Sequence, residues 1–223
     1  MSSRLLCSIA AATALVAIAG ADDGVLTGRM ENDVYVSPTG QFKIPAPVLT
    51  ELGGTITDSD SVVTFQDNYD THLSIACFEM DAAQKWELDT LGLRDYLLHF
   101  FTNFVLTNFQ ARFPKSTIES ARFMPDLLDG TMITFALLPG GSSFESRNRI
   151  VDDQPQTPVV AKRGTLLFVR NRHVYVVSSE LAERATQRST YNRTVEQENL
   201  LLTERLTTLA GRFIFADNKS RTP

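Results

Sequence analysis

The sequence predicts an α/β sandwich of the α+β class, in which a central, mostly antiparallel sheet carries helices on its faces. The first observation is the segment 93–113, whose apolar residues fall on one broad arc of a helix. The second is the set of short runs around it, which alternate apolar and polar residues at the period of a β-strand. The third is the stretch 194–210, which opens with the capping box Thr194-Val195-Glu196-Gln197 and continues with an apolar stripe. We therefore expect about six to eight strands with two helices packed on them.

The N-terminal segment 1–21 has the features of a secretory signal peptide. One cation, Arg4, precedes the uncharged run Leu5–Ala19, and Ala19-Gly20-Ala21 provides small residues at a cleavage site before Asp22-Asp23. An uncleaved membrane anchor is the alternative, although the apolar run is short for a stable span. The sequence thus predicts an extracytoplasmic protein, periplasmic or secreted.

Length and composition predict one domain without a disulfide. The 223 residues have a formal net charge of −5, which gives no electrostatic footprint for nucleic acid or for an anionic membrane. We expect a flexible lead-in over 22–33, one domain over 34–216 and a polar tail over 217–223. Cleavage at residue 21 would remove Cys7, so Cys77 would remain alone, and its alternating surroundings favour a buried apolar side chain over a reactive thiol.

Strands precede the long helix. Ser37-Pro38-Thr39-Gly40 has the proline and glycine positions of a type I turn. The expected strands are 34–36, 41–44, 55–57, 62–66 and 73–80. The last of these is apolar on both faces, as a central strand covered on both sides would be.

The helix follows a linker, 81–90, and ends before Pro114. Its apolar arc is expected to hold Leu93, Leu97, Phe100, Phe101, Phe104 and Val105, extended by Leu98 and Phe109. Further strands are expected at 117–123, 131–138, 166–170, 174–178 and 213–215. Between the expected strands 131–138 and 166–170 lies an irregular excursion, 139–162, and loops of that length are usually functional or disordered.

The order of these elements resembles the PsbP-like fold of the photosystem II extrinsic protein, a Ran-binding nuclear protein and bacterial periplasmic or lipoprotein relatives. The motifs that carry the resemblance are Tyr35-x-x-Pro-x-Gly-x-Phe42-x-Ile-Pro45, Val63-x-Phe65-x-Asp67 and Leu206-x-x-Leu209-x-x-x-Phe213. The resemblance spans residues 34–215 and implies an α/β/α sandwich. Because members of this family mostly bind partners rather than catalyse reactions, the resemblance implies a binding or accessory role.

No motif supports a catalytic, metal or cofactor site. His72, His99 and His173 are far apart and lack metal-ligand spacing, so each is expected at an ordinary surface position. Gly140-Gly141-Ser142-Ser143 could present amides to an oxyanion, but a flexible loop is the simpler interpretation. A small hydrolase whose site is assembled only by folding remains the alternative function.

A basic cluster is the main candidate for partner binding. Its members are Arg147 and Arg149 on the excursion, then Lys162, Arg163, Arg170, Arg172 and His173 on and around the following hairpin. If the excursion folds back on the hairpin, they would form one patch for a protein or other acidic ligand. The alternative is that these cations only keep strand edges soluble. We thus expect an exported, non-catalytic binding or accessory protein that uses the 139–162 loop and the 163–178 hairpin as its contact surface.

Overall fold

The computed structural model describes residues 26–144 and 159–216. The predicted signal peptide, most of the excursion with Arg147 and Arg149, and the polar tail lie outside these residues. No helix in the described ranges is long and apolar enough to cross a membrane.

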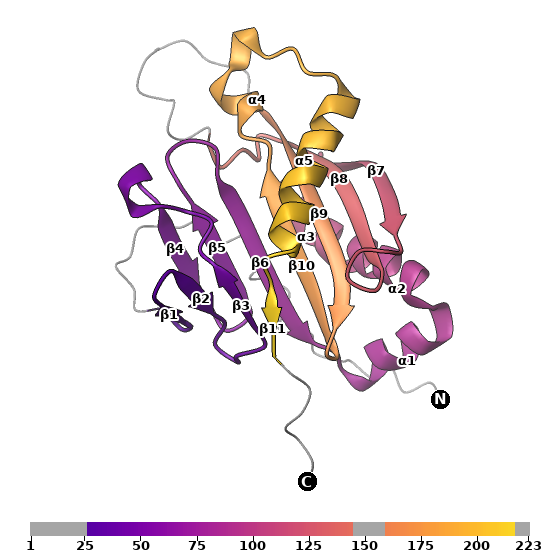
Figure 1. Ribbon diagram of the computed structural model, residues 1–223. Coiled ribbons are helices and arrows are strands. Elements are labelled where there is room, and N and C mark those ends of the chain that lie inside the picture. Colours follow the sequence, from indigo (N-terminus) through magenta and orange to yellow (C-terminus); the bar gives the residue numbers. More distant parts are fainter. Residues whose placement is uncertain (1–25, 145–158, 217–223) are drawn as a thin grey trace.

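A seven-stranded antiparallel sheet forms the centre of the molecule (Figure 1). Its strands follow the order β4-β5-β6-β10-β9-β8-β7, in which every neighbouring pair is antiparallel. The strands are β4 (Thr55–Asp58), β5 (Val62–Gln66), β6 (His72–Glu79), β7 (Thr117–Met124), β8 (Thr131–Pro139), β9 (Val160–Arg170) and β10 (His173–Glu180). The predicted antiparallel sheet is therefore confirmed.

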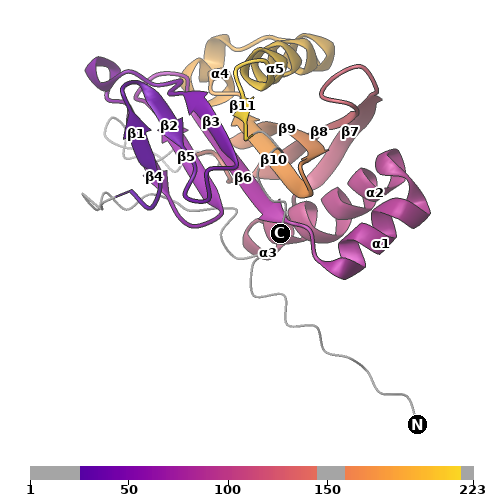
Figure 2. The same ribbon diagram turned by 60° about the horizontal axis from the view of Figure 1, so that its bottom comes forward.

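Helices cover both faces of this sheet, as predicted (Figure 2). On one face lies the continuous helical segment α2 (Leu93–Phe100), η3 (Phe101–Leu106) and α3 (Thr107–Arg112). On the other face lies α5 (Val195–Ala210), which starts at the predicted capping box: Thr194 accepts from the Gln197 amide, and the Gln197 side chain accepts from the Thr194 amide. Each helical layer shields one apolar face of the sheet from water, which is the main stabilising contribution expected for such a sandwich.

The long helix differs in phase from the predicted wheel. Tyr96 and Leu106 are buried although the wheel left them out, whereas Leu98, predicted on the apolar arc, is 42% exposed. The middle segment η3 is π-helical, with i→i+5 hydrogen bonds that shift the phase of side chains such as Leu106 away from 3.6 residues per turn. Tyr96 and Leu98 precede η3: Tyr96 lies beside Phe100 on an ordinary wheel, and the buried side of α2 includes it rather than Leu98. In addition, the predicted linker 81–90 is largely the helix α1 (Ala82–Leu91), which Asp81 and Gln84 cap reciprocally.

Two apolar cores result. The core under α5 contains Leu202, Leu206 and Leu209 together with Phe168 and Tyr175 of the sheet. The core under α2–α3 is built around Leu97, Phe101, Val105 and Phe109, packed on Leu167 and Val176 among others. Since neighbouring residues of β9 face opposite cores, this strand is covered on both sides.

A second, four-stranded sheet was not predicted. It has the order β1-β2-β3-β11 and consists of β1 (Arg29–Glu31), β2 (Val34–Val36), β3 (Phe42–Pro45) and β11 (Ile214–Phe215). Within the predicted flexible lead-in over 22–33, residues 29–31 form strand β1, which pairs with β2, and residues 22–25 lie outside the described part of the chain. The segment directly before β1 is also held, since the carboxylate of Asp58 accepts from the Thr27 and Gly28 amides at 2.8 and 2.7 Å.

The connection from β10 to α5 folds into the short helices α4 (Glu183–Thr186) and η5 (Arg188–Thr190), and η2 (Thr50–Leu52) precedes β4. Strand β9 runs the length of the sheet between two different ends. At one end β8 stops at Pro139 and β9 starts at Val160; we call this the loop end. At the other end Asn171 and Arg172 make the turn to β10; we call this the hairpin end.

Candidate anion-binding groove

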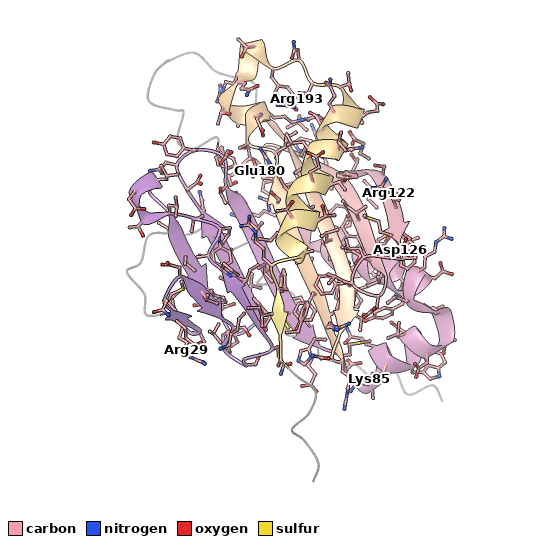
Figure 3. The ribbon with its side chains drawn as sticks, viewed as in Figure 1. Arg29, Lys85, Arg122, Asp126, Glu180 and Arg193 are labelled. Atoms are coloured by element: carbon pink, nitrogen blue, oxygen red, sulfur yellow. The ribbon has the colours of Figure 1, made fainter. Side chains whose placement is uncertain are left out.

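A groove of about 460 Å³ lies at the loop end, between the start of β9, the α4–η5 connection and the first turn of α5. Its lining includes three arginines in one short stretch of chain. We call it the arginine groove and define it by Val159, Val160, Arg184, Arg188, Tyr191, Arg193 and Glu198. Figure 3 labels Arg193 at this end of the molecule, close to the connection that enters α5.

Contacts with α5 fix the position of the groove. Arg205 of α5 holds Glu183 of α4 with two hydrogen bonds, of 2.7 and 3.2 Å. The capping box at Thr194 starts α5 directly after Arg193. The groove is therefore built on packed helices rather than on a free loop.

Glu198 forms the floor of the groove and is almost fully buried, at 1% exposure. Its two carboxylate oxygens accept from Arg184 Nε at 2.6 Å and Nη2 at 2.9 Å, from Tyr191 Oη at 2.5 Å and from Lys162 Nζ at 2.9 Å. Burial alone would raise the pKa of Glu198, but the hydrogen bonds from Arg184, Tyr191 and Lys162 outweigh it and lower the pKa to about 2. Glu198 is thus a carboxylate at neutral pH, and two cations already balance its charge.

Lys162, which also lies under this floor, is fully buried and is the link from the groove to the sheet. Its ammonium group contacts Glu119 of β7 at 2.5 Å as well as Glu198. Lys162 and Arg184 together therefore offset Glu119 and Glu198, so the buried part of this cluster carries no net charge. The positive charge of the groove comes from its remaining arginines.

Arg188 and Arg193 are these arginines. Arg188 Nε donates to the Ala185 carbonyl at 3.3 Å, which leaves its two terminal nitrogens without a hydrogen bond to any described residue. Arg193 is exposed and has no hydrogen bond or ion pair within residues 26–144 and 159–216. Two guanidinium groups at one groove thus keep donors that can take anionic oxygens.

The predicted basic patch is not one surface. Arg170 pairs with Asp129, and exposed Arg172 and half-buried His173 lie beside it at the hairpin end. Arg163 was predicted as an accessible contact but is 5% exposed, and its Nη2 lies 3.5 Å from the Glu180 carboxylate. Since extended strand rises about 3.3 Å per residue, Arg163 and Arg170 are about 23 Å apart along β9. Arg147 and Arg149 lie outside the described residues.

Glu180 explains why Arg163 faces inward. Its carboxylate, 1% exposed, accepts from Ser142 Oγ at 2.7 Å and from Ser143 through its amide at 3.0 Å and its hydroxyl at 2.5 Å. The Gly140-Gly141-Ser142-Ser143 run therefore does not point amides at an open site. Instead it anchors the first residues of the excursion to the end of β10 (Figure 3 labels Glu180).

The histidines do not come together. His72 was expected at the surface but is 9% exposed and lies edge-on to the Phe144 ring at 6.3 Å. His99 faces solvent beside Glu87, and His173 Nδ1 lies 2.8 Å from the Asn171 carbonyl oxygen. In the described ranges, no group of three or more histidine, cysteine or acidic side chains is placed to hold a metal ion. The thiol of Cys77 packs beside the core under α5, and burial raises its pKa to about 11.

Sequence reasoning missed Arg184, Arg188 and Arg193. The stretch 182–194 has no apolar period, so the sequence predicts no helix or strand there. Its one usable signal was the recurrence of arginine at short intervals before a helix start. That signal predicts no groove by itself, because the groove also involves contacts such as Arg205–Glu183 between α5 and α4, which the local sequence does not show.

Comparisons with models of protein families and with curated protein sequences found no match. Among solved structures, the chain is similar to cyanobacterial PsbP (CyanoP) from Synechocystis sp. PCC 6803, with 14% identity, a TM-score of 0.48 and coverage of 91% of this chain and 99% of that one. It is similar to the Ran-binding protein Mog1p from Saccharomyces cerevisiae, with 11% identity, a TM-score of 0.47 and coverage of 85% and 97%.

A third similar structure is a protein from Bacteroides thetaiotaomicron, with 6% identity and a TM-score of 0.42. The match covers 87% of this chain but only 52% of that protein, so the chain spans about half its length. The first two structures are of the kinds that the sequence resemblance names, and the likeness concerns the fold alone. With identities and TM-scores this low, neither partner nor activity follows from it.

Proposed function

We propose that this chain is an exported, non-catalytic binding or accessory protein that holds an acidic partner at the loop end of its sheet. The observation that carries the proposal is the pair Arg188 and Arg193, whose guanidinium donors are uncommitted at a groove built on packed helices. Charged groups at the rim of an interface steer and select an oppositely charged partner. The export part of the proposal rests on the segment 1–21 of the sequence.

The proposed contact surface is narrower than the sequence hypothesis. That hypothesis joined the 139–162 loop to the 163–178 hairpin, but β9 places the excursion and the hairpin turn at opposite ends of the sheet. The proposal keeps the loop end, where Val159 and Val160 line the arginine groove. Arg170 is already paired with Asp129, which supports leaving the hairpin end out.

Charge reversal tests the proposal. Arg188→Glu with Arg193→Glu is expected to abolish capture of the partner from envelope extract, because the groove then repels an acidic surface. Arg122→Glu with Arg172→Glu is the matched control: both arginines are exposed, both lie outside the groove, and the change in net charge is the same. Equal capture by the two double variants would contradict the proposal.

A variant that tests the excursion has to keep the hydrogen bonds of Ser142 and Ser143 to Glu180. Deleting residues from Ser142 onward would strip donors from a buried carboxylate and so destabilise the domain. Replacing residues 145–157 by a glycine–serine linker of equal length keeps Ser142, Ser143 and Phe144. We expect this variant to keep its thermal stability and lose partner capture. Unfolding of this variant would show the excursion to be structural.

A further inference from the structure

We infer that the arginine groove takes the carboxylate groups of an acidic peptide segment, with Arg188 and Arg193 as the two ligating residues. This inference rests on the proposed function and names the chemistry of the partner. The groove holds three cationic residues, but their availability differs. Arg184 donates through Nε and Nη2 to Glu198 and through Nη1 to the Val160 carbonyl at 3.3 Å. Arg184 therefore builds the wall of the site and is not its ligand.

Arg188 is placed to bind through the end of its guanidinium group. Its Nε donates to the Ala185 carbonyl, and the side chain is half-buried at the groove. Fixing Nε holds the plane of the group while both terminal nitrogens remain as donors. A pre-oriented planar fork loses less side-chain entropy per hydrogen bond than a free one, and it matches the two oxygens of a carboxylate.

Arg193 supplies the second ligand from the stretch that enters α5. It directly precedes Thr194, the N-cap of α5, so its backbone is tied to a helix start while its side chain is exposed. The two ligands come from different elements, η5 and the entry to α5, with Tyr191 between them in the chain. Such a pair suits adjacent carboxylates on one chain better than a single small ion.

The floor of the groove is a neutral cluster, which leaves the charges of Arg188 and Arg193 to the ligand. Glu198 remains a carboxylate at neutral pH beneath the arginines, and its charge is balanced by Lys162 and Arg184. Each singly charged carboxylate would meet one uncommitted guanidinium, so two neighbouring carboxylates of a peptide match the two free positive charges one to one. The remaining lining, Val159, Val160 and Tyr191, offers an apolar surface along which a peptide can lie.

The test is fluorescence anisotropy of the purified protein with three labelled probes. The probes are an alternating Glu–Gly hexapeptide, the same peptide with Gln in place of Glu, and the same peptide with phosphoserine; inorganic phosphate is the competitor. In about 20 mM salt, where screening is weak, the Glu peptide is expected to bind roughly tenfold or more tightly than the Gln peptide. Arg188→Gln with Arg193→Gln is expected to remove that difference, and Arg122→Gln with Arg172→Gln is expected to keep it.

Three results would overturn the inference. One is equal binding of the Glu and Gln peptides. Another is the same loss in the groove variant and in the control variant, which would indicate attraction by overall charge. The third is tighter binding of the phosphoserine peptide together with displacement by inorganic phosphate, which would make the groove a phosphate site. Circular dichroism melting of each variant shows that the comparison concerns folded protein.

Measuring both partner capture and peptide binding separates this inference from the proposed function. If the variant with Arg188→Gln and Arg193→Gln loses partner capture but the Glu peptide does not bind the wild-type protein, the loop end is a contact surface and only the ligand chemistry is wrong. If neither capture nor peptide binding responds to the groove variant, the proposed function fails as well.

Discussion

Replacing Glu198 by Gln tests whether the floor of the arginine groove also stabilises the fold. The substitution keeps the size of the side chain but removes a carboxylate that accepts from Lys162, Arg184 and Tyr191. The pKa of Glu198 is lowered from 4.5 to about 2, and a tenfold change in the protonation equilibrium corresponds to about 1.4 kcal/mol, so ionisation of Glu198 stabilises the fold by at most about 3 kcal/mol at pH 7. Because water reaches part of the cluster through the groove, we expect a loss of about 2 kcal/mol.

The pH dependence follows from the lowered pKa of Glu198. A carboxylate whose pKa is lowered in the folded state stabilises the protein fully above its unfolded pKa of 4.5, and this stabilisation is lost as the pH falls towards about 2. The variant lacks that titration. We therefore expect the difference in unfolding free energy between wild type and variant to shrink by roughly half or more between pH 7 and pH 3.

Urea unfolding at 25 °C, followed by circular dichroism at both pH values, measures this difference. Glu204→Gln is the matched control, because Glu204 lies on the same helix but is exposed. The control is expected to change stability by less than about 0.5 kcal/mol. Equal stability of wild type and Glu198→Gln at pH 7, or a difference that does not change down to pH 3, would refute the reasoning.

Two further predictions concern the packing of the helices on the sheet. Leu97→Ala is expected to lower the free energy of unfolding by about 2–5 kcal/mol, since Leu97 is fully buried between α2 and the sheet. Leu98→Ala is expected to lower it by less than about 1 kcal/mol, since Leu98 is 42% exposed. Thermal unfolding of both variants checks this, and similar losses would contradict the assigned helix phase. Gly164→Ala should cost about 1–3 kcal/mol, because an added Cβ would lie 2.9 Å from Leu206 Cδ1 where α5 crosses β9. At Gly211 an added Cβ would make only ordinary contacts, the nearest at 3.6 Å, so Gly211→Ala should be neutral or stabilising by about 0.4–1 kcal/mol. Urea unfolding compares the two variants. A larger loss of stability at Gly211 than at Gly164 would show that α5 does not pack on β9 as described.

Strand and cap patterns predicted most of the sheet and both of its helical layers. Period-two alternation located β5 and β8 within a residue, because these strands carry their own apolar pattern. The capping box at Thr194 located the start of α5 for the same reason: the signal is local. Strand β1 was missed because only three residues pair and none is buried.

The phase of the long helix could not be read from a wheel. A π-helical segment such as η3 moves every later side chain, and no residue pattern in 93–113 announces it. This accounts for the burial of Leu106, whereas Tyr96 and Leu98 precede η3, and their exchange reflects which side of α2 meets the sheet.

The prediction of Arg163 as an accessible member of the basic patch was wrong for a different physical reason. Arg163 and Arg170 are close in sequence, but they lie near opposite ends of the extended strand β9. In addition, the ion pair with Glu180 holds the side chain of Arg163 in a buried position. The arginine groove requires a helix–helix contact and a buried Lys162–Glu198 pair that join residues far apart in the chain. Local patterns carry no information on such contacts.

Site-specific photo-crosslinking tests most directly which end of the sheet meets the partner. A benzophenone amino acid would replace Asn192, the exposed neighbour of Arg193, in one variant and Arg172 in another, one beside the arginine groove and one at the hairpin end. Illumination in intact cells is expected to join a partner to the variant at 192 and to leave the variant at 172 unjoined. Crosslinks from 172 with none from 192 would contradict the account.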